Sequence, residues 1–169
     1  NQGDGTFTSE AELFFEVGRT WTADAHGVLW VDIDADGDQD LIETVGAGEP
    51  NHVYIQQDGV FLDAAEALGL ADVTASGRCA VALDWNLDGR IDLVLVNQAR
   101  TDGLSPTSLF TQSEDGTFVL EHALPAGVQH PTALCATLAN VDSDPEPELL
   151  RFSMPSHLSA HDLRSDLRD

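Results

Sequence analysis

The sequence contains no lysine, and its seven basic residues are all arginines, set against 30 aspartates and glutamates. The resulting formal net charge is −23. A surface this acidic repels phosphate backbones and anionic head groups, so the composition argues against binding to nucleic acid or to membrane surfaces. Long apolar runs are also missing, and none approaches the roughly 20 residues that a membrane-spanning helix needs. We therefore expect no membrane insertion.

Cysteine is scarce as well, because Cys79 and Cys135 are the only two in the chain. They are too few for a disulfide scaffold, and they form no Cys-x-x-Cys pair. Packed sheets lie about 10 Å apart, whereas a disulfide needs Cα atoms within about 7 Å. We expect two buried thiols on equivalent strands rather than a disulfide, and the redox compartment stays open.

The composition is nevertheless that of a folded protein. Hydrophobic residues make up 42% of its 169 residues, which is normal for a globular domain with a sizeable core. The length suits one domain or part of a larger one. The sequence begins at Asn1, without an initiator methionine or a signal peptide, so we expect a mature, excised or partial chain.

Aspartate-rich segments recur along the chain. We call them loop 1 (residues 32–40), loop 2 (residues 84–92) and loop 3 (residues 140–148), and their starts are 52 and 56 residues apart. A second marker, Asp-Gly-x-Phe, occurs at 4–7, 58–61 and 115–118, spaced by 54 and 57 residues. Two markers with one period predict a repeat architecture.

Short apolar runs flank each loop, which predicts that the loop joins two strands of a hairpin. The expected strands are 28–31, 41–45, 52–57 and 60–62 in the first repeat, 79–83, 93–96, 107–112 and 117–120 in the second, and 133–139 and 149–152 in the third. Four strands in about 54 residues match the size of a β-propeller blade. The predicted fold is therefore all-β, with propeller-type blades of four antiparallel strands and about three repeats.

The predicted organisation has five parts: outer strands of a preceding blade (1–12), repeat 1 (13–70), repeat 2 (71–126), a partial repeat 3 (127–154) and a non-repeat tail (155–169). We also expect one helical turn within 63–70, and a short helix at 160–167 capped by Ser159. A closed propeller needs about four to eight blades, so we expect a piece of a longer propeller. The alternative is that incomplete end blades complete one another between subunits by strand exchange.

The loops present oxygen ligands at the spacing that a hard cation needs. Calcium suits these oxygen ligands, because the loops contain no Cys or His, the residues that softer metals prefer. Gly37 and Gly89 allow the sharp bend at the sixth position. The candidate ligands are Asp32, Asp34, Asp36, the carbonyl of Asp38, and Asp40 in loop 1; Asp84, Asn86, Asp88, the carbonyl of Arg90, and Asp92 in loop 2; and Asn140, Asp142, Asp144, Glu146 and Glu148 in loop 3. Loop 3 departs from the pattern, with Asn140 first and Pro145 in place of glycine.

The loops have two competing interpretations, of which the flanking runs reject the second. Aspartates also gather in turns because they are soluble turn formers. Loop 1 satisfies the EF-hand formula, including Glu43 at the twelfth position. An EF-hand needs helices on both sides, however, whereas apolar strand-like runs flank this loop, and the other two loops place Leu95 and Arg151 at the twelfth position.

At this point the sequence resembles the FG-GAP or VCBS repeats of integrin-α-like β-propellers, through Asp-x-Asp-x-Asp-Gly-x-x-Asp-Leu at 32–41 and Asp-x-Asn-x-Asp-Gly-x-x-Asp-Leu at 84–93. The segment Asn-Gln-Gly-Asp-Gly-Thr-Phe-Thr at 1–8 is similar to bacterial proteins of the ASPIC/UnbV type. The resemblance covers roughly residues 1–152. It implies calcium between the first two strands of each blade and an extracellular or periplasmic setting.

Other candidate sites are weaker. The histidines at 26, 52, 122, 130, 157 and 161 are scattered, and no nucleophile elbow, Walker loop or dinucleotide fingerprint occurs. A carboxylate that binds calcium is also held ionised, which makes it a poor proton donor. We therefore expect no enzyme. Trp30 and Trp85 are expected to pack between blades, and Trp21 to be exposed.

The sequence thus favours a calcium-binding, extracytoplasmic repeat module for adhesion, binding or structural assembly. Its expected partners are proteins or glycans at a cell surface, with self-association through incomplete end blades. Two alternatives stay open: a structural subunit of a surface filament completed by strand exchange, and a carbohydrate-binding or enzyme-attached accessory module.

Overall fold

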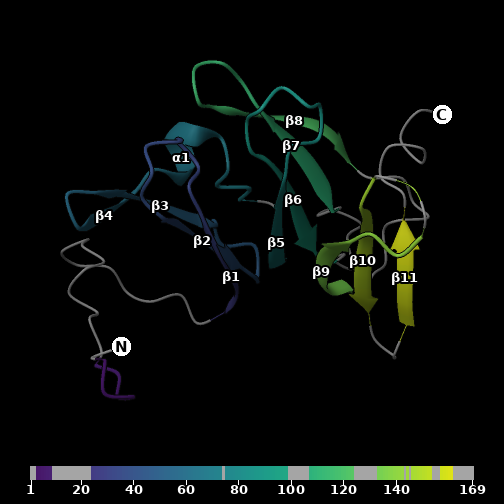
Figure 1. Ribbon diagram of the computed structural model, residues 1–169, viewed down its shortest axis with the longest axis horizontal. Helices are drawn as coiled ribbons and strands as arrows, with labels where there is room; N and C mark the ends of the chain where they lie inside the picture. The colour runs from purple at the N-terminus through teal and green to yellow at the C-terminus, as the bar shows by residue number, and fades with distance from the viewer. Residues whose placement is uncertain are drawn as a thin grey trace.

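Three antiparallel sheets follow one another along the chain in the computed structural model (Figure 1). The structure describes residues 3–8, 24–73, 75–98, 107–123, 133–142, 144, 146–153 and 157–161. Sheet 1 comprises β1 (Ala25–Val31), β2 (Asp40–Val45), β3 (His52–Gln57) and β4 (Val60–Asp63). Sheet 2 comprises β5 (Gly77–Leu83), β6 (Asp92–Asn97), β7 (Ser108–Gln112) and β8 (Phe118–Ala123). Sheet 3 comprises β9 (Ala133–Ala139), β10 (Glu148–Ser153) and β11 (His157–His161).

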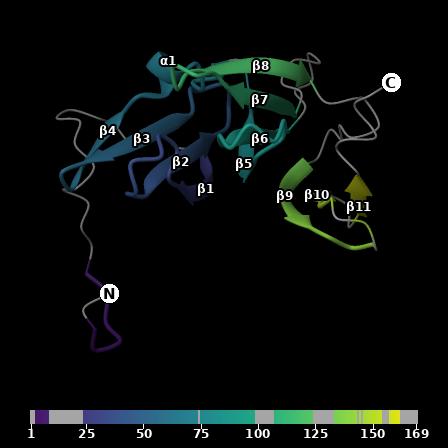
Figure 2. The same ribbon diagram turned by 45° about the horizontal axis from the view of Figure 1, so that its top comes forward.

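The all-β prediction and the four-stranded antiparallel sheets are confirmed. Sheets 1 and 2 have the same strand order as the sequence, β1-β2-β3-β4 and β5-β6-β7-β8. The expected helical turn is α1 (Ala65–Leu68), which follows β4 and ends at Gly69 in the left-handed conformation. Within the described residues the three sheets do not close into a ring (Figures 1 and 2).

Local sequence explains the hairpin between β3 and β4. Asp58 and Gly59 both have positive φ, 54° and 80°. Gln57 pairs with Val60 directly across this two-residue turn. Two positive φ values match the turn type that suits the right-handed twist of a hairpin, and Asp-Gly is a favoured sequence for it.

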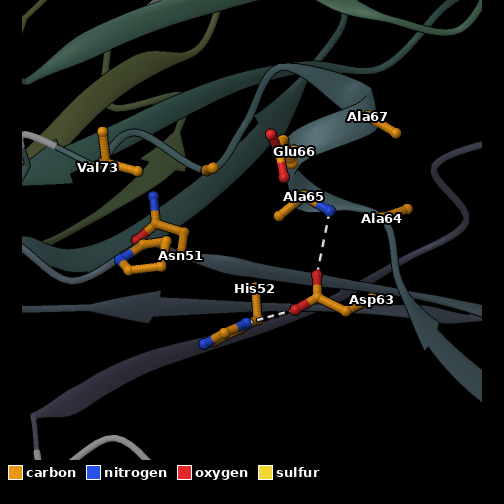
Figure 3. A pocket seen from close by; sticks show the side chains of 10 residues that line it. Asn51, His52, Asp63, Ala64, Ala65, Glu66, Ala67 and Val73 are labelled. Atoms are coloured by element: carbon orange, nitrogen blue, oxygen red, sulfur yellow. Dashed lines mark hydrogen bonds and ion pairs between the residues drawn. The ribbon is translucent and has the colours of Figure 1, made fainter. Parts of the chain in front are cut away.

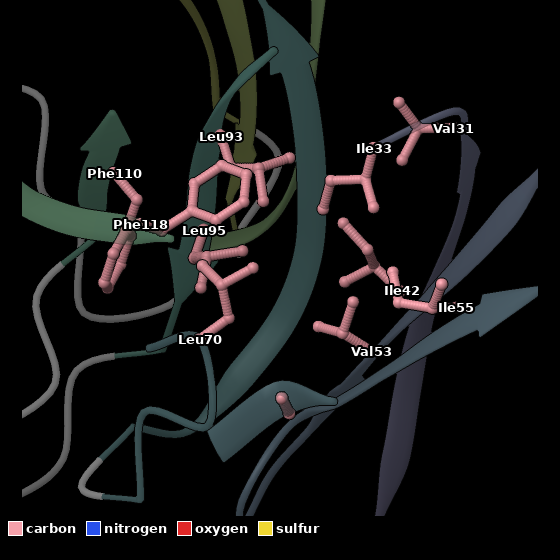
Figure 4. Close-up of a cluster of buried hydrophobic side chains, with 11 residues drawn as sticks. Val31, Ile33, Ile42, Val53, Ile55, Leu70, Leu93, Leu95, Phe110 and Phe118 are labelled. Atoms are coloured by element: carbon pink, nitrogen blue, oxygen red, sulfur yellow. The ribbon is translucent and has the colours of Figure 1, made fainter. Parts of the chain in front are cut away.

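The core lies between successive sheets, and β6 of the middle sheet is buried along its whole length. The larger cluster joins sheets 1 and 2, as Figure 4 shows. Its members are Val31, Ile33, Ile42, Val53, Ile55, Ala65, Leu70, Leu93, Leu95, Phe110 and Phe118. A second cluster joins sheets 2 and 3 through Cys79, Val81, Val94, Val96, Leu109, Ala133, Ala136 and Leu149. The first strands carry the stacking, since β1 packs against β5 and β5 against β9.

The expectation of two buried thiols is wrong. Cys79 and Cys135 form a disulfide between β5 and β9, with their Cα atoms 5.1 Å apart. The argument from a 10 Å sheet spacing fails here because the first strands of neighbouring sheets converge. Cys79 is buried whereas Cys135 is exposed.

Both ends of the chain differ from expectation. Residues 157–161 form β11, which pairs with β10, so sheet 3 extends into the predicted tail. The predicted helix at 160–167 is therefore wrong at its start. There, strand pairing with β10 outweighs the N-cap signal of Ser159. Residues 162–169 lie outside the described part of the chain. Residues 3–5 form bends and residues 6–8 have no regular secondary structure, so the described part of the segment 1–12 contains no strand.

The two described tryptophans behave differently. Trp85 is partly buried against the core between sheets 2 and 3, as predicted. Trp30 is 53% exposed and packs edge-on against Phe61 of its own sheet, with ring centroids 5.9 Å apart, so packing between sheets is wrong for it. The reason is that β1 places Trp30 on the face opposite to Val31, away from sheet 2. Trp21 lies outside the described residues.

Candidate metal-binding loops

Loops 1 and 2 begin with the same hydrogen-bonded turn. Asp32 accepts hydrogen bonds from the backbone N–H groups of Asp36 and Gly37, both at 3.1 Å. Asp84 accepts the equivalent bonds from Asp88 and Gly89, both at 3.0 Å. In each loop, the carboxylate at the first position therefore binds the backbone N–H groups of the fifth and sixth residues.

The third and fifth positions continue the pattern. Asp34 and Asn86 each accept a hydrogen bond from the fifth backbone N–H, at 3.3 Å and 3.1 Å. The fifth side chains, Asp36 and Asp88, accept bonds from the seventh N–H at 2.8 Å and 2.9 Å. These nested turns curl the backbone around the side-chain oxygens.

The backbone also takes an unusual conformation at the same place in both loops. Ala35 and Leu87, at the fourth position, have φ of 60° and 61° although neither is glycine. Gly37 and Gly89, at the sixth position, have φ of 97° and 84°. Left-handed non-glycine residues are uncommon and carry a cost of roughly 1–2 kcal/mol. The shared strain indicates that the loop geometry is held by its side chains.

The ninth position closes each loop with a fully buried carboxylate. Asp40 accepts hydrogen bonds from Ile33 (2.8 Å) and from Gln56 of β3 (2.9 Å). Asp92 accepts the equivalent bonds from Trp85 (2.8 Å) and from Gln112 of β7 (2.9 Å). Each carboxylate thus ties the loop to the third strand of its own sheet.

Burial raises the pKa of both Asp40 and Asp92 above the ordinary aspartate value, although the backbone hydrogen bonds oppose this shift. Carboxylates in the same loop raise the pKa further, Asp34 and Asp36 for Asp40 and Asp88 for Asp92. A cation bound beside these groups would favour their ionised form.

Loop 1 brings three carboxylates to one point. Oxygens of Asp32, Asp34 and Asp40 all lie within 4.8 Å of one another, close enough for one ion to bridge them. Loop 2 has the same turn geometry but carries less negative charge. Asn86 stands at the third position, where loop 1 has the carboxylate of Asp34, and the guanidinium of Arg90 forms an ion pair with Asp88. Loop 2 therefore offers a weaker anionic site than loop 1.

Loop 3 gathers carboxylates despite its divergent sequence. Oxygens of Asp142, Asp144 and Glu148 lie within 4.8 Å of one another. Glu148 is buried and accepts a hydrogen bond from Val141 at 2.7 Å, which repeats the ninth-position contact of the other loops. The side-chain amide nitrogen of Asn140 donates a hydrogen bond to the carbonyl of Asp144, a contact that the aspartates at the first position of loops 1 and 2 cannot make.

The remaining predicted ligands lie outside these clusters. Asp36 is exposed and its carboxylate is engaged by the N–H of Asp38. Asp38 and Arg90, the two predicted backbone-carbonyl ligands, and Glu146, a predicted ligand of loop 3, each stand at the seventh position of their loop. Glu146 donates its own N–H to Asp144 at 2.9 Å.

Gln112, which is not among the predicted site residues, connects two loops. Its backbone N–H binds Asp92 of loop 2, and its side-chain amide donates to the carbonyl of Ile33 in loop 1 at 2.8 Å. A hollow of about 450 Å³ lies here, between loop 1 and the residues around Arg90 and Gly116. The only sequence signal was positional: Gln56 and Gln112 both stand shortly before an Asp-Gly turn.

A second hollow, of about 670 Å³, lies at the other end of sheet 1 beside α1 (Figure 3). His52 Nδ1 lies 2.5 Å from Asp63 Oδ2, while Asp63 Oδ1 accepts a hydrogen bond from Ala65 at 3.1 Å. Asp63 is partly buried, which alone would raise its pKa, but these hydrogen bonds outweigh burial and lower the pKa. Among the described lining residues there is no Ser, Thr or Cys that such a pair could activate. The pair fastens β3 to the start of α1.

No known protein-family model matches the chain, and no curated protein matches it either. Across the described residues, none of the helical structure has the length and hydrophobicity of a membrane span.

Proposed function

We propose that this chain is a calcium-stabilised module of stacked four-stranded sheets, of the FG-GAP or VCBS type, that serves binding, adhesion or structural assembly outside the cytoplasm rather than catalysis. One observation carries the proposal. Loops 1 and 2 share the same hydrogen bonds at the first, third, fifth and ninth positions, and loop 1 converges three carboxylates on one point.

The donor set fits calcium. All side-chain donors in the clusters of loops 1 and 3 are carboxylate oxygens, and Ca²⁺ takes six to eight oxygen ligands in flexible geometry. Backbone carbonyls and water would complete the shell. Without a cation, three carboxylates that lie this close repel one another, and the buried ninth residue resists ionisation. A divalent cation removes both costs.

Binding would be linked to folding through the ninth residue. Asp40 contacts the loop and β3 together, so a cation held by Asp32, Asp34 and Asp40 would connect β1, β2 and β3. A ligand that binds only the folded state stabilises it, by about 2.7 kcal/mol at 100 times its Kd.

Two observations support the wider proposal. The three sheets stack in series through their first strands, which is how blades of a propeller are arranged around an axis. The Cys79–Cys135 disulfide favours an oxidising compartment, since such bonds are rare in the cytosol.

The test is calcium titration of the chelator-treated, desalted protein by calorimetry, together with thermal unfolding in calcium or in EDTA. We expect saturable heat and a higher Tm in calcium. Asp34→Ala removes a loop 1 ligand and should abolish binding at that site. Glu49→Ala, which removes an exposed carboxylate outside the loops, is the matched control. Absence of heat together with identical melting curves in calcium and EDTA would refute the proposal, and equal responses to magnesium would refute the choice of calcium.

A further inference from the structure

Loops 1 and 2 form a matched pair that differs in charge. Both have the same turn hydrogen bonds and the same closing contact with the third strand of their sheet. Residues 32–40 contain five aspartates and no basic residue, which gives a formal charge of −5. Residues 84–92 contain three aspartates and Arg90, which gives −2. Because the backbone geometry is shared, a difference in cation binding between the two loops would come from these side chains.

Arg90, at the seventh position of loop 2, is held at two points. Its Nη2 forms an ion pair with Asp88 Oδ2, and its Nε donates to the carbonyl of Gln112 on β7 at 3.0 Å. Asp88 Oδ1 accepts the backbone N–H of Arg90 at 2.9 Å. Arg90 therefore contacts both oxygens of the carboxylate that loop 2 offers at its fifth position, and the bond to Gln112 keeps the guanidinium there.

Loop 1 has no such internal cation. Its seventh residue is Asp38, whose backbone N–H donates to Asp36 at 2.8 Å but whose side chain is negative. Oxygens of three loop 1 carboxylates lie within 4.8 Å of one another, whereas the three carboxylates of loop 2, all in the described part of the chain, form no such group. The seventh position is also the one position at which the two loops carry opposite charges.

We propose that Arg90 lowers the calcium affinity of loop 2, so that loop 1 fills at a lower calcium concentration than loop 2. The inference rests on the proposed function and deepens it, because it gives the two loops different parts in the response to calcium. The guanidinium competes with a bound cation for Asp88, and it repels any cation held by the rest of the loop. Loop 1 is then the site that stays filled when calcium is scarce, and loop 2 is the site that responds as calcium rises.

Coulomb's law gives the size of the effect. A unit positive charge about 6 Å from a divalent cation weakens the binding of that cation about tenfold at the dielectric constant of water. Reversal of the charge, from Asp38 in loop 1 to Arg90 in loop 2, therefore corresponds to roughly a hundredfold. Asn86 adds to the difference, since calcium affinity is tuned by the number of charged ligands. Salt screens these interactions, so the effect is largest at low ionic strength.

NMR of the isotope-labelled whole chain measures the two loops separately, because the backbone amides of Gly37 and Gly89 stand at the sixth position of loops 1 and 2. Chelator-treated protein is titrated at low ionic strength in buffers of nanomolar to millimolar free calcium. Arg90→Gln removes the guanidinium, whereas Arg90→Lys keeps the positive charge. Asp38→Arg places the same residue in loop 1. Arg78→Gln is the matched control, since it removes an equal charge at the opposite end of β5 from loop 2.

In wild type we expect the Gly37 amide to respond at a lower calcium concentration than the Gly89 amide. Arg90→Gln should lower the midpoint for Gly89 about tenfold and leave the midpoint for Gly37 unchanged. Arg90→Lys should respond as wild type does. Asp38→Arg should raise the midpoint for Gly37 by about a hundredfold, and Arg78→Gln should change neither midpoint. The remaining amide signals check that every variant is folded.

An unchanged Gly89 midpoint in Arg90→Gln overturns the inference, and so does a wild type in which both amides respond at the same concentration. Should Arg90→Gln not fold, Asp38→Arg decides the matter, since an unchanged Gly37 midpoint there contradicts the same rule. Failure of the proposed function gives a different result, in which neither amide of wild type responds up to millimolar calcium. In that case a Gly89 response that appears in Arg90→Gln supports the role of Arg90, and its absence overturns that role as well.

Discussion

Replacing Asp92 tests the central feature of the loops, which is the closing contact made by a buried carboxylate. Asp92 is fully buried and accepts two backbone hydrogen bonds, from Trp85 at 2.8 Å and from Gln112 at 2.9 Å. In Asp92→Ala both N–H groups lose their partner. Each unsatisfied buried donor costs about 1–3 kcal/mol. Burial of the charged carboxylate raises the pKa of Asp92, so keeping it ionised in the folded state costs free energy. This cost offsets part of the stabilisation from the two hydrogen bonds. We therefore expect Asp92→Ala to lower the free energy of unfolding by about 2–4 kcal/mol.

Asp92→Asn separates hydrogen bonding from charge. The asparagine oxygen can keep one of the two bonds, whereas its NH₂ group faces the other donor, so we expect about half of the alanine effect without calcium. In calcium, both variants should lose the metal-linked part as well. Urea unfolding followed by tryptophan fluorescence, in EDTA and in calcium, measures all four values. Glu114→Ala, an exposed carboxylate in the nearby turn, is the control.

The reasoning would be refuted by an Asp92→Ala protein whose unfolding free energy in EDTA lies within about 0.5 kcal/mol of wild type, which is the usual range for surface substitutions. An Asp92→Asn effect equal to that of alanine would instead show that charge, and not the two hydrogen bonds, closes the loop.

Three further predictions follow from the packing. Gly27→Ala would place a Cβ 2.6 Å from the carbonyl oxygen of Arg78, so β1 and β5 must separate, and thermal unfolding should show a loss of about 1–3 kcal/mol. Cys79→Ala opens a disulfide across a sequence separation of 56 residues and should cost about 2–4 kcal/mol, while thiol titration of unfolded, unreduced wild type should find no free thiol. Asp63→Asn should lower stability at neutral pH by about 2 kcal/mol, with the gap closing in acid: because the folded pKa of Asp63 is lowered, its contribution is present above the unfolded value of 3.8 and is lost as pH falls through the folded value. A gap that stays constant down to the acid limit would contradict this assignment for Asp63.

Local signals in the sequence were sufficient for the strands and the loops. Alternating apolar residues predict strands because side chains alternate across a sheet, and Asp-Gly predicts a hairpin because glycine accepts positive φ. The closing role of Asp40 and Asp92 also follows from position in the loop. The two backbone donors that each carboxylate binds were not predictable in detail, since Gln56 and Gln112 come from a strand 16 and 20 residues away.

Non-local geometry explains the predictions that failed. The disulfide depends on the convergence of β5 and β9, which no spacing along the chain records. Similarly, β11 forms because β10 has a free edge, which outweighs a weak helix signal around Ser159. Trp30 is exposed because β1 turns it away from sheet 2, although its sequence neighbours Leu29 and Val31 are apolar.

By itself, the sequence determined the acidic character of the protein, the recurrence of its loops and the placement of its strands, because these depend on composition, periodicity and turn chemistry within short segments. Only the tertiary structure decided which carboxylates converge, that Gln112 joins two loops, and that Cys79 meets Cys135. Those properties depend on how sheets distant in sequence pack against one another, and packing is fixed by the whole fold.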